Sequence, residues 1–276
     1  MHEIDFAKGH GTRNDFVLFT DSDGRIELTD AQVRGLCDRR AGVGGDGILR
    51  AVRGRHVPEW DGDPDLWFMD YRNADGSTAA MCGNGLRVFA RYLVEQGLAE
   101  GPRFRVGTRA GERWVALATD QITAGLDEAR VGGPVAVVLD GVRHPATKVD
   151  VGSLHAVTFL PPGQLDALDL TRAPSWEPAE VFPDGVNVEF VEVVAPDRLR
   201  MRVHERGIGE TLSCGTGSAA AAAVHASSSG WTDEITVDVP GGSLSVRFHG
   251  SEAVLTGPAV IVAHGRVDLD QLAIEA

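Results

Sequence analysis

One short pattern, Cys-Gly-x-Gly, occurs twice in this chain of 276 residues. Cys82-Gly83-Asn84-Gly85 lies in the first half, and Cys214-Gly215-Thr216-Gly217 follows 132 positions later (214 − 82). Each copy directly precedes a stretch whose residues predict a helix. A single copy would indicate little. Two copies, each near the end of one half, predict two similar halves that contribute matched groups to one site.

A glycine-rich turn that leads into a helix can bind an anion. The helix N-terminus has N–H groups without helical partners and a partial positive charge, so it binds carboxylates. Glycines allow a ligand to approach the bare backbone. A thiol at this place is expected to have a lowered pKa and to act as a base or nucleophile. We therefore predict that Cys82 and Cys214 act on one substrate. One thiolate would remove the Cα proton while the other thiol supplies a proton to the opposite face.

Other interpretations of the cysteines stay open at this point. A redox-active disulfide between Cys82 and Cys214 is one of them, because two neighbouring thiols oxidise easily. Cys37 lies on the apolar face of a predicted helix, where packing is its expected role. Three cysteines without a CxxC pair argue against a disulfide framework or a zinc site and favour a reducing cytoplasm. We therefore expect no bound metal.

Charge and hydropathy narrow the set of partners. The net charge of −14 argues against a nucleic acid or an anionic membrane, both of which need a basic face. The N-terminal residues carry no apolar run, and no stretch reaches 18 apolar residues, so we expect a cytoplasmic protein. Lys8 and Lys148 are the only lysines, and neither lies in a setting typical of a pyridoxal phosphate Schiff base. The lysines therefore argue against a pyridoxal phosphate cofactor, and we expect no cofactor once the family resemblance below is taken into account.

Strand-like runs outnumber helical stretches and mostly follow one another, which predicts an α+β fold rather than a doubly wound sheet. Apolar spacing, capping residues and small-residue runs predict helices at 29–39, 84–96 and 217–226, with a shorter one at 165–170.

The remaining pattern concerns strands and domain limits. Residues 235–248 predict a β-hairpin, and 254–262 predict one further strand. We expect an N-terminal half at 1–126, which carries the first cysteine loop, and a C-terminal half at 127–262, which carries the second. The segment 263–276 is expected to pack on the N-terminal half.

Six motifs together resemble the diaminopimelate epimerase family. They occur in the family's order from residue 8 to residue 217, and with a compatible tail the resemblance covers nearly the whole chain. The motifs are Lys8-Gly9-His10-Gly11-Thr12-x-Asn14-Asp15-Phe16, Asn73-Ala74-Asp75-Gly76-Ser77, Met81-Cys82-Gly83-Asn84-Gly85, Asp184-Gly185-Val186-Asn187-Val188, Glu205-Arg206-Gly207 and Gly209-Glu210-Thr211-x-Ser213-Cys214-Gly215-Thr216-Gly217.

The resemblance implies a fold and an activity. The family folds as two similar halves, each a β-barrel-like sheet around a central helix, with the active site in the cleft between them. Its members need no pyridoxal phosphate, and the resemblance implies a homodimer. The implied reaction is the epimerisation of LL-diaminopimelate to meso-diaminopimelate, a precursor of lysine and peptidoglycan, by a thiol–thiolate pair.

The resemblance also assigns residues. Cys82 and Cys214 would be the catalytic pair, with His155 and Glu205 tuning or orienting them. Arg206 can hold a carboxylate through two parallel hydrogen bonds, which a lysine cannot. The implied substrate-binding residues are Asn14, Asn73, Gly83, Asn84, Ser153, Asn187, Glu205, Arg206, Gly215 and Thr216.

One stretch departs from the family pattern. The family's Gly-Asn-Pro-His reads Gly152-Ser153-Leu154-His155 here. The missing Asn normally helps to bind the distal carboxylate, and an unpaired buried polar group costs about 1–3 kcal/mol, enough to shift substrate preference tenfold. The alternative is therefore a specialised racemase with an altered distal pocket, such as an O-ureidoserine racemase. We favour diaminopimelate, because the rest of the distal clamp is retained: Asn73, Asn187, Glu205 and Arg206.

Other classes explain less of the sequence. A cysteine hydrolase would use one cysteine with a histidine and leave the second loop unexplained. A non-catalytic amino-acid-binding protein would have no need of paired thiols. A proline racemase lacks the Glu205-Arg206-Gly207 motif, and a phenazine-pathway isomerase lacks the cysteine pair.

Overall fold

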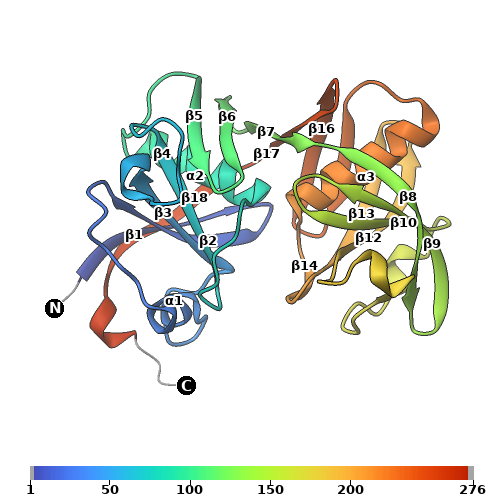
Figure 1. Cartoon of the computed structure of the whole chain (residues 1–276), viewed down its shortest axis with the longest axis horizontal. Coiled ribbons are helices and arrows are strands. Elements are labelled where there is room, and N and C mark those ends of the chain that lie inside the picture. Colours follow the sequence, from blue (N-terminus) through green and yellow to red (C-terminus); the bar gives the residue numbers. More distant parts are fainter. Residues whose placement is uncertain (1–2, 273–276) are drawn as a thin grey trace. The chain divides into compact units, whose positions relative to one another are not determined.

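The computed structural model describes residues 3–272 and divides the chain into two compact units. The first unit contains the chain up to Ala124 and again from Pro258, and the second is Gly125–Gly257. The last four residues of the expected segment 263–276 lie outside the described residues. Each unit is a sheet with one long buried helix, as the α+β prediction requires (Figure 1).

In the first unit, neighbouring strands pair in the order β18, β1, β2, β3, β4, β5, β6 and the first residues of β7, which continues past Ala124 into the second unit. The pairs β2–β3 and β4–β5 are parallel, and the others are antiparallel. The strand bounds are β1 Glu3–Gly11, β2 Asn14–Asp21, β3 Gly47–Arg53, β4 Trp67–Asn73, β5 Arg103–Thr108, β6 Gly111–Leu117, β7 Ile122–Glu128 and β18 Val260–Asp268.

The helix α2 (Gly83–Glu95) forms the centre of the first unit and packs against β1, β2, β3, β4, β6 and β18. Leu86, Phe89 and Leu93 repeat at helical spacing and are fully buried, which explains why this stretch folds as a helix against the sheet. The helix predicted at 84–96 is confirmed.

A second helix, α1 (Asp30–Cys37), lies at the edge of the first unit. Thr29 caps it, and Gln32 completes the capping box, so the predicted helix is confirmed with a shorter C-terminal end. Cys37 is buried in an apolar cluster with Val33 and Leu36. Burial raises the pKa of the Cys37 thiol to about 12, which agrees with a packing role.

In the second unit, neighbouring strands pair in the order β11, β8, β9, β10, β12, β13, β15, β16 and β17, and β14 lies on β13. The pairs β10–β12 and β13–β15 are parallel. The strand bounds are β8 Arg130–Leu139, β9 Val142–Asp150, β10 Leu154–Phe159, β11 Ser175–Glu177, β12 Asn187–Ala195, β13 Arg198–Glu205, β14 Gly209–Thr211, β15 Ile235–Val239, β16 Gly242–His249 and β17 Glu252–Gly257.

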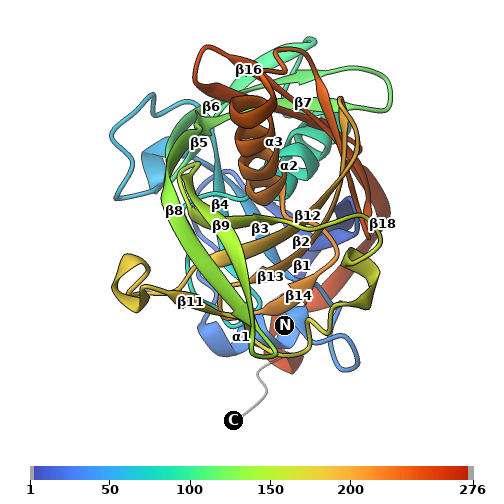
Figure 2. The same cartoon turned by 90° about the vertical axis from the view of Figure 1, so that its right-hand side faces the viewer.

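The helix α3 (Gly215–Ser229) is the counterpart of α2 in the second unit and contacts β8, β10, β12 and β16, among other strands (Figure 2). Its buried face consists largely of the alanine run 219–223. Gly230 ends the helix in the left-handed conformation, with φ 73°. The predicted helix and the hairpin at 235–248 are confirmed, and the helix is longer at both ends than predicted.

Two details of the prediction were wrong. The single strand expected at 254–262 is divided between β17 and β18, because Pro258 has no N–H for a sheet ladder and separates them. The short helix expected at 165–170 is only a 3₁₀ turn at Leu165–Ala167. Further 3₁₀ turns occur at Gly54–His56, Ala179–Val181 and Leu269–Gln271.

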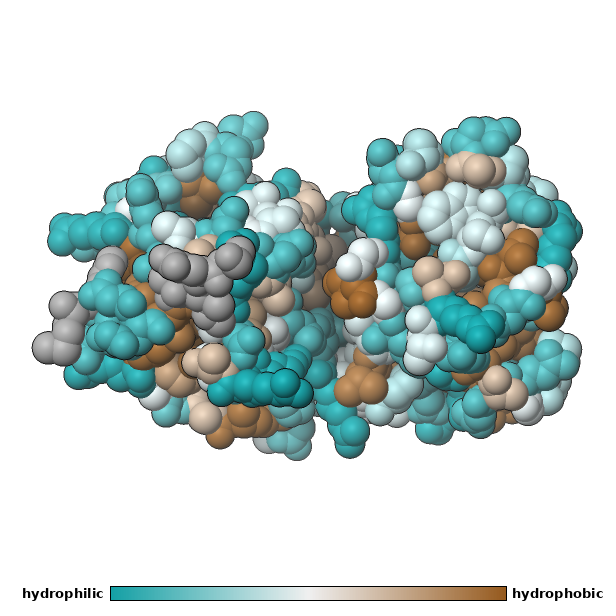
Figure 3. Space-filling view, turned by 90° about the horizontal axis from the view of Figure 1, so that it is seen from below, coloured by the Kyte–Doolittle hydropathy of each residue, from teal (hydrophilic) through white to brown (hydrophobic). Residues whose placement is uncertain are grey.

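The visible surface is mostly hydrophilic, and hydrophobic residues form separate small spots on the face shown in Figure 3. Within residues 3–272, no helix has the length and apolar character needed to cross a membrane.

Candidate active site

The first cysteine loop is held by the N-terminus of α2. Cys82 is the N-cap residue, and its Sγ accepts a hydrogen bond from the Gly85 N–H at 3.3 Å. The same sulfur lies 3.6 Å from Oδ1 of Asn14, at the start of β2. The Asn84 side chain donates to that same oxygen at 3.3 Å. The structure thus brings three predicted residues of the first unit together: Asn14, Cys82 and Asn84.

A fully buried arginine lies behind this loop. One Nη of Arg87 donates to the Gly83 carbonyl at 3.2 Å, and the other to Oδ1 of Asn84 at 2.9 Å and to Oγ1 of Thr12 at 3.4 Å. Burial lowers the pKa of Arg87 to about 10, while the nearby Cys82 acts in the opposite direction. Arg87 is therefore still a cation at neutral pH.

Asn73, at the end of β4, is connected to the first loop through hydrogen bonds of other residues. It donates to Oγ of Ser77 at 3.0 Å and accepts from the Tyr71 hydroxyl at 2.7 Å. Asp46 joins this turn to the first loop, because its backbone carbonyl accepts from the residue after Asn73 and its carboxylate accepts from Asn14 at 2.7 Å. Asn73 thus behaves as a turn residue here, and its predicted contact with a substrate stays a prediction.

The second cysteine loop has the same backbone arrangement. Cys214 caps α3, and its Sγ accepts from the Gly217 N–H at 3.4 Å and lies 3.5 Å from Oγ1 of Thr216. The lowered pKa predicted for this thiol is wrong. Burial raises the pKa of Cys214 well above its ordinary value, and the Glu205 and Glu189 carboxylates raise it further. The helix N-terminus lowers the pKa of this thiol less than desolvation raises it, because only 7% of Cys214 is exposed.

His155 is fully buried on β10, with a partner on each ring nitrogen. Nδ1 lies 2.7 Å from Oε1 of Glu189, and Nε2 lies 2.8 Å from Oγ of Ser153. A carboxylate can only accept, which places a proton on Nδ1. Oε2 of Glu189 is buried without a hydrogen-bond partner. A Cβ at Gly217 would lie only 2.6 Å from Oε1 of Glu189, so this carboxylate lies directly against the second loop.

Arg206 extends from the end of β13 and is exposed. Oδ1 of Asn187 accepts from its backbone N–H at 2.9 Å, and its guanidinium donates to the Asp184 carbonyl at 3.3 Å. Neighbouring Glu205 accepts a hydrogen bond from the Thr211 hydroxyl. Within the part of the chain that the structure describes, no acid forms an ion pair with Arg206, so its charge is available to an anionic ligand.

Sequence reasoning missed two residues, Arg87 and Glu189. Each is a charged residue flanked on both sides by apolar residues, within a run of buried residues. The apolar neighbours were the sequence signal that could have revealed these two residues, because a charge in such a segment must find a partner inside the protein. Gly83 and Gly215, which were predicted, are the first residues of α2 and α3. All three cysteines carry free thiols.

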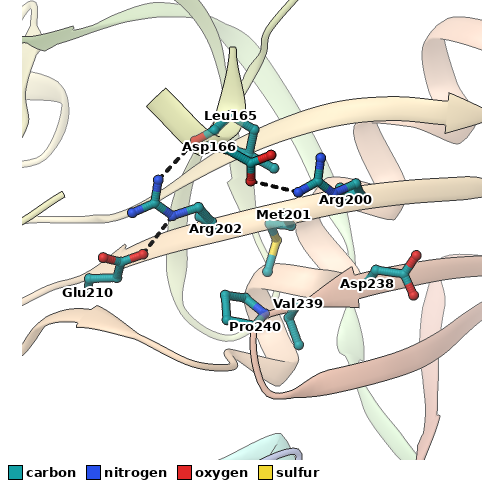
Figure 4. Close-up of a pocket in the computed structure, with 9 residues that line it drawn as sticks. All are labelled: Leu165, Asp166, Arg200, Met201, Arg202, Glu210, Asp238, Val239 and Pro240. Atoms are coloured by element: carbon teal, nitrogen blue, oxygen red, sulfur yellow. Dashed lines mark hydrogen bonds and ion pairs between the residues drawn. The ribbon is translucent and has the colours of Figure 1, made fainter. Parts of the chain in front are cut away.

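A pocket of about 440 Å³ in the second unit contains none of the predicted site residues (Figure 4). Its arginines are already paired, Arg202 with Glu210 and Arg200 with Asp166, each at 2.7 Å. These internal ion pairs leave little free charge for a ligand, so we do not assign the substrate to this pocket.

Comparison with known proteins identifies the family. The model of the family described as diaminopimelate epimerase matches residues 6–131 and 147–262. The chain belongs to the diaminopimelate epimerase family. The diaminopimelate epimerase of Thermobifida fusca is 50% identical over 277 residues, covering 97% of this chain and 99% of the relative. That of Streptomyces coelicolor is 48% identical and covers 96% of each.

Solved structures of more distant proteins show the same fold. A phenazine biosynthesis protein of the PhzF family from Bacillus anthracis superposes with a TM-score of 0.70 at 16% identity, covering 97% of this chain and 99% of that one. A hydroxyproline epimerase from Agrobacterium vitis gives 0.69 at 16% identity, covering 96% and 92%. The predicted α+β fold of two similar halves is confirmed for this member of the diaminopimelate epimerase family.

Proposed function

We propose that the chain is a diaminopimelate epimerase that converts LL-diaminopimelate to meso-diaminopimelate without pyridoxal phosphate or a metal. The observation that carries the proposal is the pair of matched loops, in which Cys82 and Cys214 each cap a buried helix and each accept the N–H three residues on. Curated relatives that cover nearly the whole chain at 44–50% identity carry this activity in their names.

The reaction needs one cysteine from each unit at the same Cα. The thiolate takes the Cα proton, and the thiol gives its own proton to the opposite face, so one proton leaves the carbon as another arrives. The N–H groups at the starts of α2 and α3 stabilise the substrate's α-carboxylate and the negative charge that develops next to it. After one turnover the two sulfurs have exchanged protonation states.

We assign the distal end of the substrate to polar and charged groups of the second unit. Arg206, which has no acidic partner within residues 3–272, would hold the distal carboxylate. Asn187 fixes the Arg206 backbone, and Glu205 would attract the distal ammonium. Ser153 is hydrogen bonded to His155, so we assign it to orienting that ring rather than to the substrate.

Proton exchange at Cα in D₂O, followed by NMR under reducing conditions without pyridoxal phosphate, tests the assignment. LL-diaminopimelate should exchange and invert, while O-ureido-L-serine and L-serine should not. Inversion of the ureido compound alone would replace the proposed substrate by that of a specialised racemase. Absence of exchange with all three would reject the diaminopimelate and ureidoserine assignments together.

We further propose that the enzyme acts in the cytoplasm as a homodimer with a small amino-acid substrate. Support comes from the free thiols and from the family resemblance. Light scattering of the purified protein gives the molar mass in solution, and a monomer at micromolar concentration would contradict the dimer.

A further inference from the structure

Arg87 is a buried charge with no opposite charge beside it. Its side chain is 0% exposed, and its hydrogen bonds go to neutral oxygens of Gly83, Asn84 and Thr12. Its Nε is buried without any partner. No acidic side chain between residues 3 and 272 pairs with it. A buried cation of this kind is costly unless an anion compensates it.

The contacts of Arg87 all lead to the first cysteine loop. Its guanidinium reaches back one turn to the Gly83 carbonyl, directly after Cys82. It also holds the Asn84 amide, whose nitrogen donates to the same Asn14 oxygen that Cys82 contacts. The charge therefore lies where an anion at the sulfur of Cys82 would compensate it.

Other charged groups near this loop are already engaged. They come from β1, β2 and the loop before β3, and they pair among themselves: Lys8 with Asp15, and Arg39 with Asp15 and Asp46. His10 on β1 accepts from the Arg13 N–H. Arg87 is thus the charge that lacks compensation at this loop, within the described ranges of the first unit.

The second loop has the opposite electrostatic character. Five positions after Cys214, where α2 carries its arginine five positions after Cys82, stands Ala219. The buried charged group against this loop is the acid Glu189, which is bound to His155, and the carboxylate of Glu205 also acts on Cys214. A carboxylate at this place opposes ionisation of Cys214, whereas a guanidinium favours ionisation of Cys82.

We propose that Arg87 is a positioning residue whose buried positive charge stabilises the thiolate of Cys82, so that in the free protein Cys82 is ionised and Cys214 is protonated. The role of this difference in catalysis rests on the proposed function. The charge distribution itself is a property of the free protein and is measured without substrate.

The test is the pH dependence of alkylation by iodoacetamide, followed for each cysteine-containing peptide by mass spectrometry in the reduced, folded protein. The midpoint pH reports ionisation independently of how accessible each sulfur is. The midpoint of Cys82 should lie at least one pH unit below that of Cys214, which means a tenfold or greater difference in acid dissociation constant. Equal midpoints, or a lower one for Cys214, would overturn the proposal without any variant.

Variants at Arg87 then isolate its charge. Arg87→Met should raise the Cys82 midpoint by about one to three pH units, the usual effect of losing a close opposite charge. Arg87→Lys keeps the charge and should restore most of the shift. Arg91→Met is the matched control, because Arg91 lies one turn further along α2 and donates to the Ala259 and Thr119 carbonyls instead.

A folded Arg87→Met protein with an unchanged Cys82 midpoint would overturn the proposal. If its KM for diaminopimelate were also raised, the guanidinium would serve the substrate carboxylate instead. If Arg87→Met does not fold, the wild-type midpoints and Arg87→Lys still decide the question. Failure of the proposed function would appear as absent exchange with LL-diaminopimelate and would leave these midpoints unaffected.

Discussion

The loops at Cys82 and Cys214 have nearly the same backbone and opposite charges behind it. In both, the sulfur accepts the N–H of a glycine three residues on, at 3.3 and 3.4 Å. Behind the first loop lies the cation Arg87, and behind the second the acid Glu189. A local motif therefore determines where each sulfur lies, while residues elsewhere in each unit determine how easily it ionises.

Removal of either sulfur is expected to have the largest effect. Cys82→Ala and Cys214→Ala should each lower the inversion rate by about 1,000-fold or more, because proton transfer by a positioned base or acid contributes roughly 10²- to 10⁴-fold. Cys37→Ser is the control and should retain activity, since Cys37 packs in an apolar cluster. Polarimetry on LL-diaminopimelate measures the rate. Loss of activity in only one of the two alanine variants would contradict a two-base mechanism.

Neutralising Glu189 should make the two loops more alike. Because its carboxylate raises the pKa of Cys214, Glu189→Gln should lower the alkylation midpoint of Cys214 by about one pH unit and leave Cys82 unchanged. The substitution also weakens the hydrogen bond between His155 and residue 189, so the inversion rate should fall by roughly tenfold or more. A rise in the Cys214 midpoint would show that Glu189 acts on this sulfur in another way.

A glycine-to-alanine substitution in each loop compares how tightly the two loops are packed. Gly217→Ala would place a Cβ 2.6 Å from Oε1 of Glu189, and this buried contact should cost about 1–3 kcal/mol of unfolding free energy. The Cβ of Gly85→Ala would lie 3.3 Å from the side chain of Cys82 and 3.5 Å from that of Leu49, and the helix propensity gained, about 1 kcal/mol, should offset these contacts. Urea denaturation compares the two variants. Equal destabilisation would show that Glu189 does not limit the space at the second loop.

The smallest expected effect concerns acid stability of the first unit. Lys8 and Arg39 hold the pKa of Asp15 well below its usual range despite burial, which acts the other way. A depressed folded-state pKa gives stability that is present above the unfolded value, about 3.9, and lost as pH falls below it. The stability difference between wild type and Asp15→Asn should therefore be constant from pH 7 to 5 and shrink below about pH 4. A difference that grows on acidification would contradict this.

The sequence predicted features that depend on neighbouring residues. The two cysteine loops, the three helices and the 235–248 hairpin follow from capping residues, glycines and periodicity within short windows. Asn14 and Cys82 lie in contact. The roles of the site residues stay predictions, because nothing in the structure tests a bound substrate, and the domain limits stay predictions as well.

Features that depend on burial could not be predicted in this way. The raised pKa of Cys214 results from desolvation inside the second unit, which the loop sequence alone does not show. The apolar flanks of Arg87 and Glu189 indicate burial, but they do not show which groups surround each charge in the folded unit. The interruption at Pro258 was visible in the sequence, but the apolar residues on both sides obscured it.

The alanine run 219–223 in α3 has a consequence for how mutations are tolerated. The strands around α3 pack against methyl groups and backbone, so a larger side chain there has no free rotamer and must displace a strand. The core around α2 contains Leu86, Phe89 and Leu93, which volume-conserving exchanges can repack. The core around α2 should therefore tolerate substitutions between apolar residues, whereas the helix that Cys214 caps should tolerate only small residues.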